Sequence, residues 1–149
     1  MTTKLLYESD FYHWTVDQVQ SLRLGKLDRL DLKNLAEEIE SLGNQQRSEL
    51  ENRLAILLGH ILKWDLQPDL RGKSWRSTIR EQRRQIQKLI IKNPSLKPYL
   101  EEAMAEGYES ALDLVVRETP LDYKDLPQVC PYTIAQVLDA NFPVNVETG

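Results

Sequence analysis

The chain has few of the residues that form covalent cross-links and metal sites: one cysteine, Cys130, and two histidines among 149 residues. A lone cysteine cannot form an internal disulfide and excludes a metal cluster held by several cysteines. A di-iron site in a helical bundle needs Glu-x-x-His on two helices, yet residue 57, three before His60, is leucine. Asp10-x-x-His13 is the one acid-x-x-His spacing. We therefore expect no metal and no cofactor.

Long apolar runs, clustered glycines and a signal sequence are missing as well. The longest uncharged apolar run, residues 54–62, is interrupted by Gly59 and His60. It is far shorter than the ~20 residues that a membrane-spanning helix needs. The six glycines are scattered singly, which excludes a glycine-rich phosphate loop. The first residues lack the apolar core of a signal peptide. We expect a cytoplasmic protein without membrane association.

Strand patterns are missing too, because no run alternates β-branched or aromatic residues with polar ones between turns. Apolar residues instead recur at helical spacing along most of the chain. This predicts an all-α, compact single-domain bundle of about five main helices plus a short C-terminal helix. The domain is expected to cover residues 1–149, with an ordered core at about 7–142 and a flexible tail at 143–149. The predicted helices cover residues 10–24, 31–42, 45–65, 73–92, 95–119 and 133–138, with a break at Gly43-Asn44, Ser95 as a cap, and 45–65 at the centre.

Positive charge is concentrated in one segment of an acidic protein. Residues 71–92 hold eight basic residues and one acid, a local charge of +7, so that the rest of the chain sums to −11 within a total of −4. In the predicted helix 73–92, the side chains of Arg76, Arg80 and Arg83 form a stripe beside the apolar arc. Such a stripe suits a bound anion, because a guanidinium can donate two parallel hydrogen bonds to phosphate or carboxylate.

A short turn containing Pro68 predicts that helices 45–65 and 73–92 form an antiparallel hairpin. Residues whose numbers sum to about 138 would then lie level, which places Trp64 beside Trp75 and His60 beside Trp75 or Ile79. The resulting candidate ligand-binding cluster is His60, Lys63, Trp64, Trp75, Arg76, Arg80 and Arg83. Alternatively, the tryptophans are core residues and each arginine pairs with an acid from Glu37–Glu51 or Glu101–Asp125, which is the arrangement we favour.

A second candidate cluster lies in the first two predicted helices. It contains Asp10 and Trp14 from the first helix and Glu37 and Glu40, which share one face of the second. Paired acids on a helix are also an ordinary feature of a solvated surface. No motif in the chain determines a reaction or a catalytic residue.

Several motifs resemble one known family in order and spacing. They are Tyr7-Glu8-x-Asp10-Phe11-Tyr12-x-Trp14, Asp31-Leu32-x-Asn34-Leu35-Ala36-Glu37-Glu38-Ile39-Glu40-x-Leu42-Gly43, His60-x-Leu62-Lys63-Trp64-x-x-Gln67-Pro68, Ser74-Trp75-Arg76-x-Thr78-Ile79-Arg80-x-Gln82-Arg83 and Cys130-Pro131-Tyr132. In these motifs the chain resembles a bacterial, largely cyanobacterial family catalogued as domain of unknown function 29. The resemblance covers about residues 7–142 and implies a compact helical protein, with no activity attached.

Three functional hypotheses follow. The first is a protein-interaction or small-anion-binding module, whose partner is another protein or a second copy of the chain. The second is a nucleic-acid or nucleotide binder that uses the basic helix 73–92. The third is a hydrolase-like enzyme centred on His60. Salt-dependent binding of nucleic acid separates the second hypothesis from the first.

Overall fold

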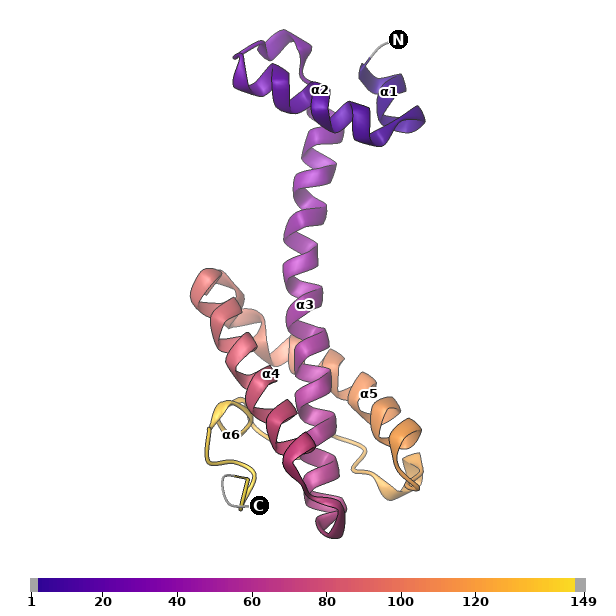
Figure 1. Cartoon of the computed structure of the whole chain (residues 1–149), viewed down its shortest axis with the longest axis vertical. Helices are drawn as coiled ribbons and strands as arrows, with labels where there is room; N and C mark the ends of the chain where they lie inside the picture. Colours follow the sequence, from indigo (N-terminus) through magenta and orange to yellow (C-terminus); the bar gives the residue numbers. More distant parts are fainter. Residues whose placement is uncertain (1–2, 147–149) are drawn as a thin grey trace. The chain divides into compact units, whose positions relative to one another are not determined.

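The computed structural model describes residues 3–146, with side chains from Leu6 onward, and all regular elements in this part of the chain are helical (Figure 1). The α-helices are α1 (Thr3–Ser9), α2 (Phe11–Arg23), α3 (Leu32–Leu66), α4 (Lys73–Lys92), α5 (Leu100–Glu118) and α6 (Ile134–Leu138). Short 3-10 turns cover Leu27–Arg29, Pro68–Leu70, Pro94–Tyr99 and Tyr123–Asp125. The all-α prediction is confirmed. Within these residues, no helix combines the length and apolar character needed to cross a bilayer.

The chain divides into two compact units, residues 1–45 (unit 1) and 46–149 (unit 2). A single domain over the whole chain stays a prediction. Unit 1 contains α1, α2 and the beginning of α3, and unit 2 contains the rest of α3 with α4, α5 and α6.

The predicted break at Gly43-Asn44 is wrong, because α3 is one helix of 35 residues. An isolated glycine costs a helix interior only about 1 kcal/mol relative to alanine, and no proline follows to remove a hydrogen bond. Good helix formers on both sides therefore carry the helix through the glycine. The two predicted helices 31–42 and 45–65 are parts of this single element.

The other helix predictions differ mainly at the ends. The helices predicted at 10–24, 73–92 and 133–138 are confirmed as α2, α4 and α6 within one residue at each end. Ser95 does not cap a helix. It lies in the 3-10 turn Pro94–Tyr99, and α5 begins only at Leu100. Pro98 explains the delay, because proline disfavours the α conformation in the residue before it. Helix α1 has no counterpart among the predicted helices.

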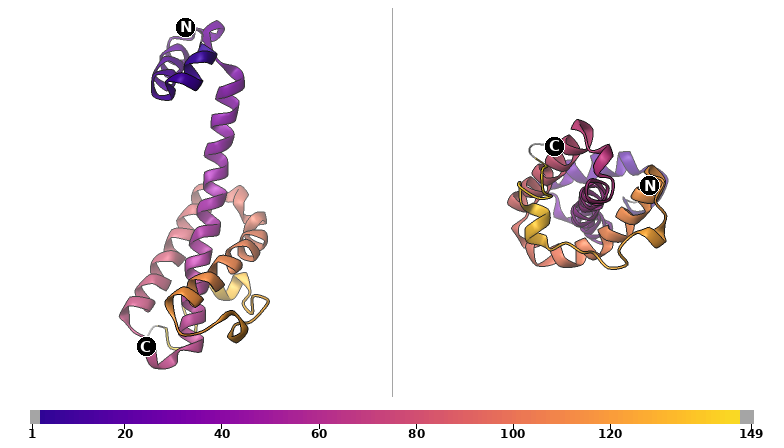
Figure 2. Two further views of the ribbon diagram at one scale, coloured as in Figure 1. Left: turned by 90° about the vertical axis from the view of Figure 1, so that its right-hand side faces the viewer. Right: turned by 90° about the horizontal axis from the view of Figure 1, so that it is seen from below.

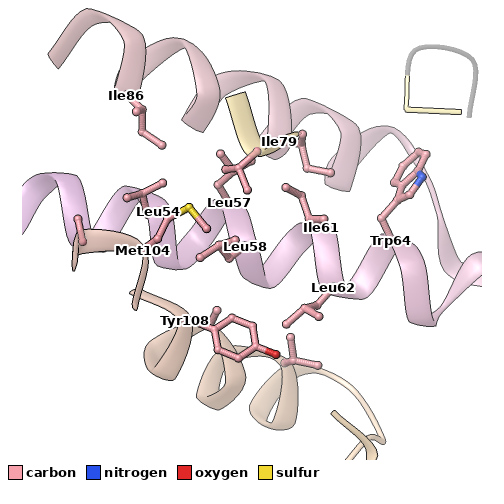
Figure 3. Close-up of a cluster of buried hydrophobic side chains, with 14 of the residues drawn as sticks. Leu54, Leu57, Leu58, Ile61, Leu62, Trp64, Ile79, Ile86, Met104 and Tyr108 are labelled. Carbon is pink, nitrogen blue, oxygen red and sulfur yellow. The ribbon is translucent and has the colours of Figure 1, made fainter. Parts of the chain in front are cut away.

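In unit 2, α3 lies between α4 and α5, as the right-hand view of Figure 2 shows along its axis. Ile79 and Ile86 of α4 point toward one side of α3, while Met104 and Tyr108 of α5 face the other (Figure 3). The segment of α3 between them is apolar nearly all round, which is typical of a buried helix. Its fully buried side chains are Leu50, Leu54, Leu57, Leu58, Ile61, Leu62 and Trp64.

The first residues of the predicted flexible tail pack on unit 2. Val146 is buried in the core, and the indole N–H of Trp64 donates to the Val144 carbonyl at 3.0 Å. The last three residues of the predicted tail, 147–149, lie outside the described residues. The segment that runs from α6 to Val146 forms one wall of a concavity on α4.

Candidate functional site

Five cationic side chains of α4 line a concavity of about 760 Å³ on the surface of unit 2. Ala140 and Val146, from the segment after α6, complete the wall opposite the helix. None of the described residues that line it is acidic. The lining is Lys73, Arg76, Ser77, Ile79, Arg80, Arg83, Arg84, Gln87, Ala140 and Val146.

The cations reach one side of α4 because of their spacing. Residues three and four apart in a helix lie on the same face, and the lining follows that spacing from Lys73 to Gln87. Arg84 lies eleven positions after Lys73, so the row extends roughly 16–17 Å along the axis at ~1.5 Å per residue. Arg80 and Arg84 are exposed and Arg76 is half-buried. Positive charge therefore faces the concavity along its length.

Arg83 differs from its neighbours because it is buried and 5 % exposed. Its Nε donates to the Val137 carbonyl at 2.9 Å, and its Nη2 donates to the Phe142 carbonyl at 2.6 Å. These bonds connect α4 to a segment more than fifty residues later in the chain. Arg83 thus positions the wall of the concavity as well as lining it.

The favoured arrangement, in which the stripe pairs with acids, is not what the described residues show for Arg76 and Arg80. The ion pairs between described residues are Arg47–Glu102, Arg53–Glu49 and Lys63–Glu118. None of them includes Arg76 or Arg80. Arg76 and Arg80 therefore have no ion-pair partner among the residues that the structure describes.

His60, Lys63 and Trp75 form a separate polar cluster with Glu118 at the end of α5. Lys63 is 4 % exposed. Its Nζ donates to Glu118 Oε2 at 2.7 Å and lies 5.5 Å from the centre of the Trp75 ring. A buried ammonium is stable only when it is paired. The ion pair with Glu118 connects α3 with α5, and the contact with the Trp75 ring connects α3 with α4. The hydrogen bond from Lys63 holds the pKa of Glu118 below its usual 4.5.

His60 belongs to this cluster and not to the concavity. Its Nδ1 lies 2.8 Å from the carbonyl oxygen of Ile56, one turn earlier in α3. Burial lowers the pKa of His60 below its usual 6.5, and the Lys63 charge lowers it further, against the opposing effects of the Ile56 carbonyl and Glu118. The contact with the Ile56 carbonyl holds the ring against its own helix.

Trp64 makes contacts of its own. The Arg71 guanidinium lies 5.1 Å from the centre of its ring, and Arg71 Nε donates to the Trp64 carbonyl at 2.7 Å. Among the described side chains, the aromatic contacts do not include a Trp64–Trp75 pair.

The predicted cluster is thus divided into three groups. The three arginines line the concavity, His60, Lys63 and Trp75 lie near Glu118, and Trp64 contacts Arg71. Lys73 and Arg84, which the prediction omitted, line the concavity and could have been found from the same three-and-four spacing.

The second predicted cluster is also divided. Asp10 caps α2 by accepting the His13 backbone N–H at 3.1 Å. The buried Trp14 donates its indole N–H to Asp31 Oδ2 at 3.1 Å. Glu37 and Glu40 are exposed. Asp10 and Trp14 therefore have structural contacts that hold unit 1 together.

Two buried polar side chains of unit 1 also bond to Asp31, the residue before α3. The buried Gln18 accepts the Asp31 backbone N–H at 2.8 Å, and the buried Asn34 donates to Asp31 Oδ2 at 2.7 Å.

Within the described residues, no three His, Cys, Asp or Glu side chains gather in a way that could hold a metal ion. Cys130 is half-buried, and burial raises the pKa of its thiol.

Comparison with curated proteins and with solved structures finds no match to this chain. The sequence profile of one family, described as "Domain of unknown function DUF29", matches residues 6–143, nearly the entire length. The chain therefore belongs to the DUF29 family.

Proposed function

We propose that this protein binds a compact phosphate-bearing anion in the concavity on α4. The observation that carries the proposal is the convergence of five cations on a surface hollow whose described lining contains no acid. The protein as a whole is acidic, so this concentration does not follow from a generally basic surface.

The chemistry of the lining suits phosphate. Arginine forks donate two hydrogen bonds in the geometry that phosphate oxygens accept, and three arginines with exposed or half-buried side chains are available. Ser77 and Gln87 add neutral hydrogen-bonding groups at the same surface. Several neighbouring cations repel one another, and a bound polyanion relieves that repulsion.

The size and the remaining lining favour a small ligand over nucleic acid. A volume of about 760 Å³ lies in the ordinary range for small-molecule sites, ~300–1,000 Å³. Among the described residues of the lining, there is no aromatic side chain on which a base could stack. In addition, the −11 charge outside residues 71–92 opposes a long polyanion that extends beyond the concavity. Inorganic triphosphate is therefore the suitable first probe.

Isothermal titration calorimetry with sodium triphosphate tests the proposal. We expect binding at low salt, with an affinity that decreases as salt screens the charges, since the Debye length shortens to about 8 Å at ~0.15 M. The double variant Arg80→Gln, Arg84→Gln should bind at least about tenfold more weakly, since each lost charged hydrogen bond is worth roughly 1.5–3 kcal/mol.

The matched control is Lys88→Gln with Lys92→Gln. It removes the same charge from the same helix, at exposed positions that do not line the concavity. We expect its affinity to stay within about threefold of the parent protein, because neither lysine lines the concavity and only a long-range attraction, which salt weakens, is lost. Equal losses in both double variants, or no binding at low salt, would contradict a site at the concavity. Tighter binding of an oligonucleotide than of triphosphate would favour the nucleic-acid alternative.

A further inference from the structure

The five cations that line the concavity follow one another in a row along α4. At ~100° per residue they fall within an arc of about 100° around the helix, and from first to last they span about three helical turns. The charges are therefore spread along a line and are not gathered around one point. In order, they are Lys73, Arg76, Arg80, Arg83 and Arg84.

A single phosphate group cannot contact the whole row. Consecutive turns of a helix lie about 5.4 Å apart, so a phosphate bound at one turn contacts the cations of that turn and of the next. The two ends of the row are separated by more than the Debye length, which is about 10 Å at 0.1 M salt. A phosphate bound beside Lys73 therefore leaves Arg84 without an anionic group. A ligand that neutralises the row carries several phosphates along its length.

Among the described residues, the wall opposite α4 consists of Ala140 and Val146, which are uncharged. The hydrogen bonds from Arg83 to the carbonyls of Val137 and Phe142 hold this segment beside the row. A ring with phosphates around its circumference would turn some of them toward the uncharged wall. An unbranched chain instead keeps each of its phosphates on the side of α4.

We infer that the ligand of the concavity is an unbranched chain of linked phosphates that lies lengthwise along α4, a conclusion that rests on the proposed function. A chain of about five phosphates places one beside each of the five lining cations. A nucleoside at one end of the chain gains no stacking contact, because the described lining has no aromatic side chain. The chain is therefore an inorganic polyphosphate and not the tail of a nucleotide.

Isothermal titration calorimetry with phosphates of increasing length tests this ligand class. At low salt and neutral pH, affinity should increase from orthophosphate through diphosphate and triphosphate to linear pentaphosphate. The control is cyclic hexaphosphate, whose charge is close to that of linear pentaphosphate but whose phosphates form a closed ring. We expect the linear chain to bind at least about threefold more tightly, because the ring loses contacts with one end of the row. ATP should bind no more tightly than triphosphate.

Substitutions at the two ends of the row test the lengthwise orientation. Lys73→Gln with Arg84→Gln removes both end cations, whose side chains are exposed. Pentaphosphate should bind roughly four- to twenty-fivefold more weakly, since each exposed ion pair contributes about two- to fivefold. Diphosphate is too short to reach both ends, so the preference for pentaphosphate over diphosphate should shrink at least about threefold. Lys88→Gln with Lys92→Gln is the matched control and should keep that preference, and circular dichroism checks that each variant remains helical.

Failure of the chain and failure of the anion site give different results. No binding of any phosphate at low salt would overturn both the proposed function and the chain. If Arg80→Gln with Arg84→Gln weakens triphosphate binding while linear pentaphosphate and cyclic hexaphosphate bind equally, the anion site stands and the chain is overturned. Equal losses for diphosphate and pentaphosphate in the end variant would also overturn the chain. Tighter binding of ATP than of triphosphate would overturn the assignment to an inorganic chain.

Discussion

Replacing Arg83 by methionine should separate the structural role of this arginine from the ligand-binding role proposed for its neighbours. Arg83 is buried, and its guanidinium donates to the carbonyls of Val137 and Phe142. Methionine keeps much of the apolar stem but removes both donors. The two carbonyls, on the segment that forms the wall of the concavity, then lose their bonds to α4.

The size of the effect follows from those two bonds. A hydrogen bond from a charged donor contributes roughly 1.5–3 kcal/mol, and removing one partner leaves the other unsatisfied. Water can reach part of this segment, since Phe142 is half-buried and Asp139 to Asn141 are exposed. Rehydration of the carbonyls offsets part of the loss, so we expect Arg83→Met to lower the free energy of unfolding by about 2–4 kcal/mol.

Urea unfolding followed by circular dichroism measures this difference. The control is Arg84→Met, which removes the same charge from the next residue, where the side chain is exposed and no hydrogen bond is found among the described residues. Its effect should stay within about 0.5 kcal/mol, as for most surface substitutions. If the two variants lose equal stability, then Arg83 does not hold the segment after α6, and the reasoning from its two hydrogen bonds is wrong.

Three further predictions concern the core, the helix contacts and pH. Leu57→Ala should lower the free energy of unfolding by about 2–5 kcal/mol in urea denaturation, because this side chain is fully buried in α3. Gly43→Ala should raise stability by about 0.5–1 kcal/mol, since an added Cβ meets nothing within 4 Å. At Gly107 the added Cβ would lie 3.0 and 3.2 Å from backbone atoms of α3. Gly107→Ala should therefore be less stable than Gly43→Ala by about 1–3 kcal/mol, and thermal unfolding of both variants compares them. The lowered pKa of His60 means that the unfolded chain binds a proton more readily than the folded protein. Stability should therefore decrease as the pH falls below 6.5, and His60→Gln should reduce that dependence in urea titrations at several pH values. Unchanged pH dependence in the variant would count against this assignment.

The sequence by itself predicted α2, α4 and α6 to within one residue at each end. Helix α4 was predicted at its observed ends because an apolar arc repeats at helical spacing up to Asn93-Pro94, and a proline restricts the residue before it. The buried segment of α3 was recognisable from its nearly complete apolar circumference. The family could likewise be identified from motif order, since motifs are properties of the chain and need no contacts.

Only the tertiary structure decided which arginine is buried. Arg76, Arg80 and Arg83 look alike on a helical wheel, yet of the three only Arg83 is buried, because it bonds to the segment from Val137 to Phe142. No local signal encodes a contact between residues more than fifty positions apart. The prediction of a break in α3 at Gly43 was wrong for a related reason. The small cost of one glycine is outweighed by the cooperativity of the helix on both sides of it, which a position-by-position interpretation of the sequence does not include.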